Sequence, residues 1–171
     1  MNKIAVLGLG QSLDLFYPGE FDYTIGVNDI WGRVKTNAVV CLDSKSRFTP
    51  GRAKIIENCR PEIFYSQIIN WDTHPGFKLI KLSKTYPEQS CNLNGPEINK
   101  SLCSPFVACG IAYQLHAATE IHVFGVDFLN HQNLKTMALI RIKTHFKNLS
   151  RALLNKGCEL IIYGDGILVN N

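Results

Sequence analysis

Four residues at the end of the first apolar run could bind an anion: Gly8, Gly10, Gln11 and Ser12. The run 4–7 predicts a buried strand, and the glycines predict a sharp turn directly after it. Such a turn brings backbone N–H groups close to a ligand, and the Ser12 hydroxyl could cap a following helix. We therefore expect backbone amides in this turn to face a phosphate group.

The turn departs from the dinucleotide-binding fingerprint. Leu13 stands where a third glycine is required, and Gly19 comes too late. A nicotinamide cofactor is therefore disfavoured. No lysine of the Walker type follows the glycines, which also disfavours ordinary P-loop phosphoryl transfer. The structural alternative is a glycine turn that only tightens a strand-to-helix connection.

Five further polar residues follow other predicted strands or begin a helix. Asn28 follows the second strand, Asp43 and Ser44 follow the third, Asp127 follows the sixth, and Ser104 begins a helix. In an open α/β sheet, ligands bind outside the carboxyl ends of the strands. The sequence therefore predicts that these residues join the glycine turn in a nucleotide site. Each one alone also has a structural explanation, as a turn or cap residue.

His131 is the candidate catalytic acid or base, because it comes just after the sixth strand. An imidazole titrates near neutral pH and could take a proton from an attacking hydroxyl group. The alternative is an exposed loop histidine. No G-x-S-x-G motif occurs, so the sequence gives no sign of a serine hydrolase elbow.

Seven apolar or β-branched runs predict the strands that position these residues: 4–7, 23–27, 38–42, 62–65, 77–82, 121–126 and 158–163. Two helices are predicted over 104–118 and about 134–156. Strands interleaved with helices predict the α/β class, as an open, mostly parallel, Rossmann-like sheet with helices on both faces. The segment 84–103 is rich in Pro, Gly and Asn and is predicted to be irregular.

Length and composition predict one nucleotide-binding domain over residues 1–171. No apolar run is long enough for a membrane span, and no secretory signal is evident. The six cysteines lack metal-type spacing and are expected to be reduced, which favours a cytoplasmic location. The formal charge of +4 favours anionic ligands. Homo-oligomer formation is left open.

Lys143, Lys147 and Arg151 form a basic row on the second predicted helix, at four-residue spacing. Such a row is most often a solvated face. No aromatic residues are interleaved with it, so nucleic acid is disfavoured as a partner.

Two segments resemble a known family. The opening Gly8-x-Gly10-x-Ser12-Leu13 resembles the G-x-G-P-S-L start of the small bacterial sialyltransferases that use CMP-sialic acid. Related openings occur in MAF flagellin-modification proteins and archaeal 6-hydroxymethylpterin pyrophosphokinases. The helix that Ser104 leads and the strand Glu120-Ile-His-Val-Phe-Gly-Val-Asp127-Phe resemble the serine-led helix and the E-I-x-x-x-G-x-D-F strand of that family.

The resemblance implies a Rossmann-like fold, with Asn28 near a nucleotide and His131 in the place of the catalytic histidine. The chain also departs from the family, since Leu9 and Gln11 replace an asparagine and a proline in the turn. The family's lid, which carries tyrosines that contact the phosphate, is absent between Asp127 and the last long helix. The irregular segment 84–103 is a candidate to cover the site instead.

The function expected from these features is a nucleotide-binding transferase, glycosyltransferase-like and sialyltransferase-like, that uses a nucleotide-activated sugar and needs no metal. The first alternative is a magnesium-dependent pyrophosphokinase-like enzyme, in which Asp43 and Asp127 would hold Mg²⁺ against a triphosphate. The second alternative is a nucleotide-binding or scaffold module that kept the fold without catalysis.

Overall fold

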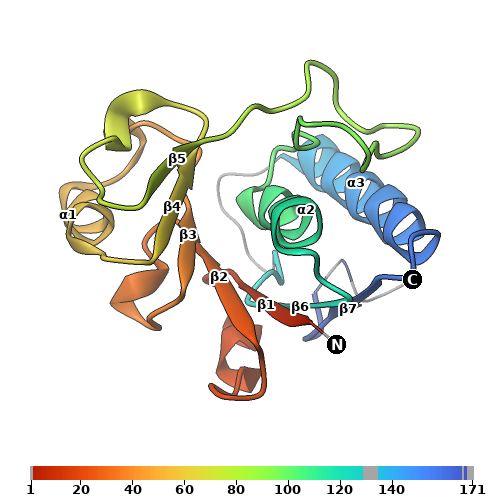
Figure 1. The fold of residues 1–171 in the computed structure, drawn as a ribbon, viewed down its shortest axis with the longest axis horizontal. Coiled ribbons are helices and arrows are strands. Elements are labelled where there is room, and N and C mark those ends of the chain that lie inside the picture. Colours follow the sequence, from red (N-terminus) through yellow and green to blue (C-terminus); the bar gives the residue numbers. More distant parts are fainter. Residues whose placement is uncertain (1, 129–134, 167, 169–171) are drawn as a thin grey trace.

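Seven strands in the described part of the chain form one parallel sheet, in the order β5-β4-β3-β2-β1-β6-β7 (Figure 1). The computed structural model describes residues 2–128, 135–166 and 168. The strands are β1 (Lys3–Leu7), β2 (Tyr23–Val27), β3 (Ala38–Val40), β4 (Ile63–Ser66), β5 (Phe77–Leu79), β6 (Glu120–Phe124) and β7 (Glu159–Ile162). Each overlaps one predicted run, so the α/β class and the open parallel sheet are confirmed.

The central strands are apolar on both sides because both faces of the sheet are covered. In β1, Ile4 and Val6 join the core on the side of α2 and α3, whereas Ala5 and Leu7 join the core on the opposite side. All four side chains are fully buried. This two-sided burial explains why β1 is a continuous apolar run rather than an alternating one.

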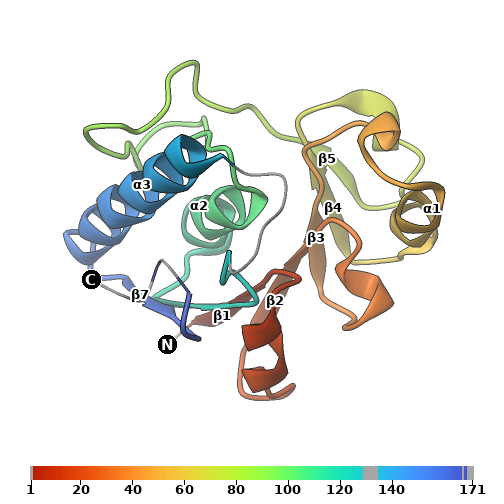
Figure 2. The ribbon, with the colours of Figure 1, turned by 180° about the vertical axis from the view of Figure 1, so that it is seen from behind.

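Three α-helices flank the sheet in the described residues: α1 (Pro50–Asn58), α2 (Ser104–His116) and α3 (Thr136–Leu154). Figures 1 and 2 show α2 and α3 on one side of the sheet and α1 on the other, as predicted for helices on both faces. The helix α1 was not predicted. It starts with proline and glycine, and Ile56 is its one buried residue, so it has no apolar stripe.

The segment after β1 is a short 3-10 helix, η1 (Gln11–Leu15), and not an α-helix. Its cap position is Gly10, with no side-chain cap bond, so the prediction that Ser12 caps a helix is wrong. The other 3-10 helices described are η2 (Ile30–Gly32), η3 (Lys45–Arg47) and η4 (Ile69–Trp71).

The strand order reverses at β1, because the chain continues to β2 on one side of it and β6 lies on the other. In an open α/β sheet, the crevice at such a switch point is where ligands bind. The carboxyl ends of β1, β2, β3 and β6 all lie at this edge because the strands are parallel. The topology therefore brings the residues predicted at strand ends to one place.

The irregular segment 84–103 is held against α2 and α3. Asn148 of α3 donates to the Pro87 carbonyl at 2.9 Å, and Gln114 of α2 donates to the Gly95 carbonyl at 2.9 Å. Arg141 of α3 forms an ion pair with Glu88. Figure 1 shows this segment running beside these two helices.

All six cysteines are free thiols, and all except the partly exposed Cys91 are buried. Burial raises the pKa of Cys103 to about 12, which favours the neutral thiol at this position. In the part of the chain that the structure describes, no helix has the length and apolar character needed to cross a bilayer.

Candidate functional site

A cavity of about 760 Å³ opens at the switch point of the sheet, and we call it the switch-point cavity. Its volume lies in the range that small-molecule sites occupy, about 300–1,000 Å³. Seven of the nine predicted ligand-binding residues line it: Gly8, Gly10, Gln11, Asn28, Asp43, Ser104 and Asp127. Ser12 and Ser44 do not belong to the lining, although both are close to it in sequence.

The amides of the glycine turn bond inside the protein. The Gly8 amide donates to the Phe124 carbonyl at 2.8 Å, and the Gly10 amide donates to the Gly125 carbonyl at 2.8 Å. The Ser12 amide donates to Asp127 Oδ2 at 2.9 Å. The expectation that these three amides face an anion is therefore wrong, because each already has an acceptor at the end of β6 or in the loop that follows it.

The glycines are required for another reason, which is the close approach of two loops. A Cβ atom added to Gly8 would lie 2.3 Å from the Gly125 carbonyl oxygen. One added to Gly10 would lie 2.4 Å from Asp127 Oδ2. The turn therefore tightens the connection after β1, which was the structural alternative for this motif.

Ser12 and Asp127 join the loops after β1 and β6. The Ser12 hydroxyl accepts a 2.8 Å hydrogen bond from the Gly125 amide, in addition to the bond that its own amide makes to Asp127. Both side chains are buried. Ser12 therefore supports the floor of the cavity, and Asp127 is both a lining residue and a structural acceptor.

Asn28 lies at the carboxyl end of β2 with a left-handed backbone (φ 53°), a conformation that asparagine tolerates better than most residues. The backbone N–H of Asn28 donates to the Val40 carbonyl of β3 at 3.0 Å, which fixes the backbone. The side-chain Oδ1 is buried and has no hydrogen-bond partner among the described residues. A buried amide oxygen without a partner at a cavity wall is a ready acceptor for a ligand N–H or O–H group.

Asp43 and its neighbours form the wall beyond β3. The Asp43 carbonyl accepts a 2.9 Å hydrogen bond from the indole N–H of Trp71, while the residue itself is exposed at the cavity. The Ser44 hydroxyl lies 2.9 Å from that of Ser46, and Ser46 is the serine that lines the cavity. The bond from Trp71 thus anchors the backbone of a lining residue that carries a carboxylate.

The helix α2 begins at the cavity with Ser104. The helix begins at Ser104, as predicted, with Cys103 at the cap position and no side-chain cap bond. The first N–H groups of a helix lack intrahelical partners and carry its positive dipole end. The start of α2 therefore adds polar, electropositive groups to one wall.

Arg47, Phe48 and Arg52 are among the twelve lining residues that were not predicted. Arg52 donates to Asp29 Oδ1 through Nε at 3.0 Å and Nη2 at 2.6 Å, and its guanidinium lies over the Phe48 ring at 5.1 Å. Arg47 is exposed and has no ion pair within the described ranges. No sequence motif marks these arginines, because the fold of α1 and η3 brings them to the cavity.

His131, the predicted catalytic residue, lies outside the described residues. None of the other four histidines, all of which are described, lines the switch-point cavity. His145, for example, is a fully buried residue of α3, and its Nδ1 lies 2.9 Å from the Ser101 hydroxyl.

Two carboxylates in the cavity are relevant to a magnesium ion. Asp43 and Asp127 both line it, and Mg²⁺ is commonly bound by one or two carboxylates together with substrate phosphates. Asp127 Oδ2 is already engaged by the Ser12 amide. In residues 2–128, 135–166 and 168, no group of three or more His, Cys, Asp or Glu side chains could hold a metal.

The chain matches no protein-family model, and no curated protein sequence matches it. Among solved structures it resembles a mutant of the alpha-2,3/8-sialyltransferase CstII, with 18% identity and a TM-score of 0.57 over 94% of this chain and 81% of that chain. It also resembles CstII from Campylobacter jejuni in complex with the substrate analogue CMP-3FNeuAc. Here the identity is 19% and the TM-score 0.51, over 95% of this chain and 79% of that chain.

This likeness establishes a sialyltransferase-like α/β fold for the chain. It supports the sialyltransferase part of the resemblance found in the sequence. The flagellin-modification and pyrophosphokinase parts stay predictions.

Proposed function

We propose that this protein is a glycosyltransferase-like enzyme that binds a nucleotide-activated sugar in the switch-point cavity. The observation that carries the proposal is the Asn28 side chain, whose buried Oδ1 lacks a partner among the described residues at the wall of a cavity of nucleotide size. The fold is that of CstII, which has been solved with a CMP-sugar analogue. A cytidine nucleotide is therefore the first ligand to test.

The polar groups of the cavity divide into two sets that suit the two ends of a nucleotide. Asn28 and Asp43 offer oxygen acceptors for the amino and hydroxyl groups of a base and ribose. Arg47 and the start of α2 at Ser104 offer positive charge for a phosphate. The pair between Arg52 and Asp29 is neutral overall, so Arg47 supplies the extra charge.

In the transfer step, an acceptor hydroxyl loses its proton to a base while its oxygen bonds to the anomeric carbon of the sugar. The bond from that carbon to the phosphate oxygen breaks, and the nucleotide leaves with one more negative charge. We assign the base to His131 and the neutralisation of the leaving charge to Arg47. Positive groups that are already in place stabilise such developing charge without reorganisation.

Calorimetry with CMP, CDP, UDP and ATP tests the proposal. We expect CMP or CDP to bind more tightly than UDP and ATP, and hydrolysis or transfer of a CMP-sugar to be lost in His131→Ala. If none of the four nucleotides binds at millimolar concentration, the proposal fails.

Two variants of Asn28 separate its side chain from its backbone. Asn28→Gly keeps the left-handed conformation at low cost, whereas Asn28→Ala strains it by about 1 kcal/mol. If the amide group contacts the nucleotide, both variants lose CMP affinity by about tenfold, or 1.4 kcal/mol. If Asn28→Gly binds CMP as well as the wild type, the proposed contact is excluded.

Magnesium-dependent pyrophosphoryl transfer is the second candidate, because Asp43 and Asp127 line the same cavity. It requires ATP binding that depends on Mg²⁺ and is lost in Asp43→Asn. CMP binding that is unchanged by chelation of metal ions would favour the glycosyltransferase. A protein that binds CMP but has no catalytic activity for His131→Ala to change would favour a binding module.

A further inference from the structure

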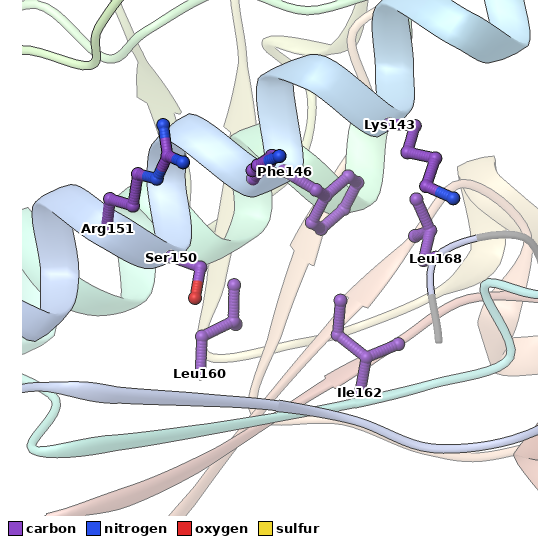
Figure 3. Close-up of a pocket in the computed structure, with 8 residues that line it drawn as sticks. Lys143, Phe146, Ser150, Arg151, Leu160, Ile162 and Leu168 are labelled. Atoms are coloured by element: carbon purple, nitrogen blue, oxygen red, sulfur yellow. The ribbon is translucent and has the colours of Figure 1, made fainter. Parts of the chain in front are cut away.

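A second cavity of about 330 Å³ lies between α3 and β7, and we call it the α3–β7 groove. Figure 3 shows Phe146 and Ser150 of α3 facing Leu160 and Ile162 of β7 across it. Lys147 and Arg151 belong to the same lining. No residue lines both this groove and the switch-point cavity, so the groove is independent of the proposed function.

The strand β7 is the end strand of the sheet in the described residues. The amides of Glu159 and Tyr163 donate to the carbonyls of residues 119 and 123 on the β6 side, at 3.0 and 2.9 Å. Backbone groups alternate in direction along a strand, so those of Leu160 and Ile162 point to the outer side. A row of such unpaired groups is a template for another strand.

The side chains of β7 also alternate between the two faces of the sheet, so the apolar residues of the groove and the acidic Glu159 lie on opposite faces. Leu160 and Ile162 face α3 and are partly exposed in the groove, since α3 does not cover them completely. Glu159, one position before Leu160, points to the opposite face of the sheet. The floor of the groove is therefore apolar.

The rim of the groove is cationic. Lys147 and Arg151 stand one helical turn apart on α3, and both are exposed. Neither forms an ion pair with any residue that the structure describes. Among the described residues, an apolar floor, a strand edge with no neighbouring strand and two cations without an ion pair define what complements this surface: an extended chain with apolar and acidic side chains.

We propose that the α3–β7 groove binds an extended segment of a partner protein, which adds as a strand to β7. The face of that strand toward α3 would alternate apolar and acidic residues. Its apolar side chains would cover Leu160 and Ile162, and its acidic side chains would pair with Lys147 and Arg151. Strand addition of this kind takes affinity from main-chain hydrogen bonds and specificity from side-chain pockets.

Nucleic acid fits the groove less well than such a peptide. Its bases need exposed aromatic rings for stacking, and the one aromatic ring of the lining, Phe146, is only 3% exposed. A second copy of this chain would bind here only if it placed acidic side chains against Lys147 and Arg151. Both remain outcomes that the experiment below distinguishes.

The test uses the full chain and a fluorescent synthetic peptide. One face of this peptide alternates glutamate and valine, and the other face is threonine. We expect saturable binding in fluorescence anisotropy, and slower hydrogen exchange of the Leu160 and Ile162 amides when the peptide is bound. The same peptide with lysine in place of glutamate should bind at least tenfold more weakly.

Three variants locate the binding surface. Lys147→Glu with Arg151→Glu should weaken peptide binding at least tenfold, and Ser150→Trp should block the groove without a change of charge. The matched control is Lys35→Glu with Lys54→Glu, which makes the same charge change at exposed positions elsewhere and should leave binding unchanged. Circular dichroism confirms that each variant is folded.

Several results would overturn the proposal. One is equal binding of the glutamate and lysine peptides, and another is peptide binding that survives both Ser150→Trp and the double charge reversal. A labelled single-stranded oligonucleotide that binds more tightly than the peptide, and loses binding in the charge reversal, would assign the surface to nucleic acid. Dimers in sedimentation that the same variants dissociate would assign it to a second copy.

Discussion

The backbone amide of Ser12 donates a 2.9 Å hydrogen bond to the carboxylate of Asp127, 115 positions later in the chain. The Ser12 hydroxyl accepts a second bond from the Gly125 amide in the same loop. These bonds join the loops that follow β1 and β6, the two neighbouring strands at which the sheet order reverses. The floor of the switch-point cavity is thus fixed by contacts within the protein.

Removing either partner of this contact should destabilise the fold. Asp127→Ala leaves the Ser12 amide without an acceptor in a buried position, and Ser12→Ala does the same to the Gly125 amide. Each should lower the free energy of unfolding by about 1–3 kcal/mol in urea titrations. Asp127→Asn keeps an oxygen acceptor and should cost less than Asp127→Ala. Equal stability of wild type and Asp127→Ala would refute a structural role for the carboxylate.

Two glycine substitutions should have opposite effects on stability. Gly8→Ala places a Cβ 2.3 Å from the Gly125 carbonyl oxygen, so the loops must separate. We expect a loss of more than about 2 kcal/mol in the free energy of unfolding. The control is Gly51→Ala in α1, where a Cβ meets nothing within 4 Å. Because it reduces the entropy of the unfolded chain, Gly51→Ala should stabilise by up to about 1 kcal/mol.

Arg47 should contribute to nucleotide affinity through its charge. Arg47→Ala should weaken CMP binding about fivefold to tenfold and reduce its dependence on salt concentration. Arg47→Lys keeps the charge without the planar guanidinium, so its CMP affinity should lie between those of the wild type and Arg47→Ala. Calorimetry at low and high salt measures both effects. Lys35→Ala removes an exposed charge that does not line the cavity, so it should change neither the CMP affinity nor its salt dependence. An equal loss of affinity in Lys35→Ala and Arg47→Ala would instead indicate a general effect of the protein's net charge.

His74 should make the stability depend on pH. Its ring stacks on Phe64 with centroids 3.9 Å apart, and burial, together with the charge of Arg60, lowers its pKa below 6.5. Below about pH 6.5 the unfolded chain therefore binds more protons than the folded chain, so stability falls as pH falls from 7 toward the folded pKa. One such group contributes a slope of at most about 1.4 kcal/mol per pH unit.

The variant His74→Phe keeps the stacked ring and removes the titrating group. Urea unfolding at intervals between pH 7 and pH 5 should give a shallower fall in stability than in the wild type. Burial also lowers the pKa values of His116 and His145, so part of the slope should remain. An unchanged slope would show that His74 is not a source of the pH dependence.

The strands were predictable because burial on both faces leaves a direct mark on the sequence. Every residue from Ile4 to Leu7 is apolar for this reason, and the run predicted β1 nearly to the residue. The helix α1 left no such mark, because Ile56 is its one buried side chain. The sequence predicted the turn Gly8–Ser12 at the right place, but it predicted the wrong partner for the amides, a ligand instead of another loop. A glycine turn that approaches a phosphate and one that approaches another loop have the same composition, so the sequence does not distinguish them.

The sequence by itself determined which segments are strands and that polar residues such as Asn28, Asp43 and Asp127 follow them, because apolar burial and strand ends are local properties. Only the tertiary structure decided what those residues touch. The partner of the Ser12 amide and the arrival of Arg47 and Arg52 at the cavity depend on which loops lie side by side, and that is set by the strand order. Hydrogen bonds between residues more than a hundred positions apart follow from that order, and no local pattern encodes them.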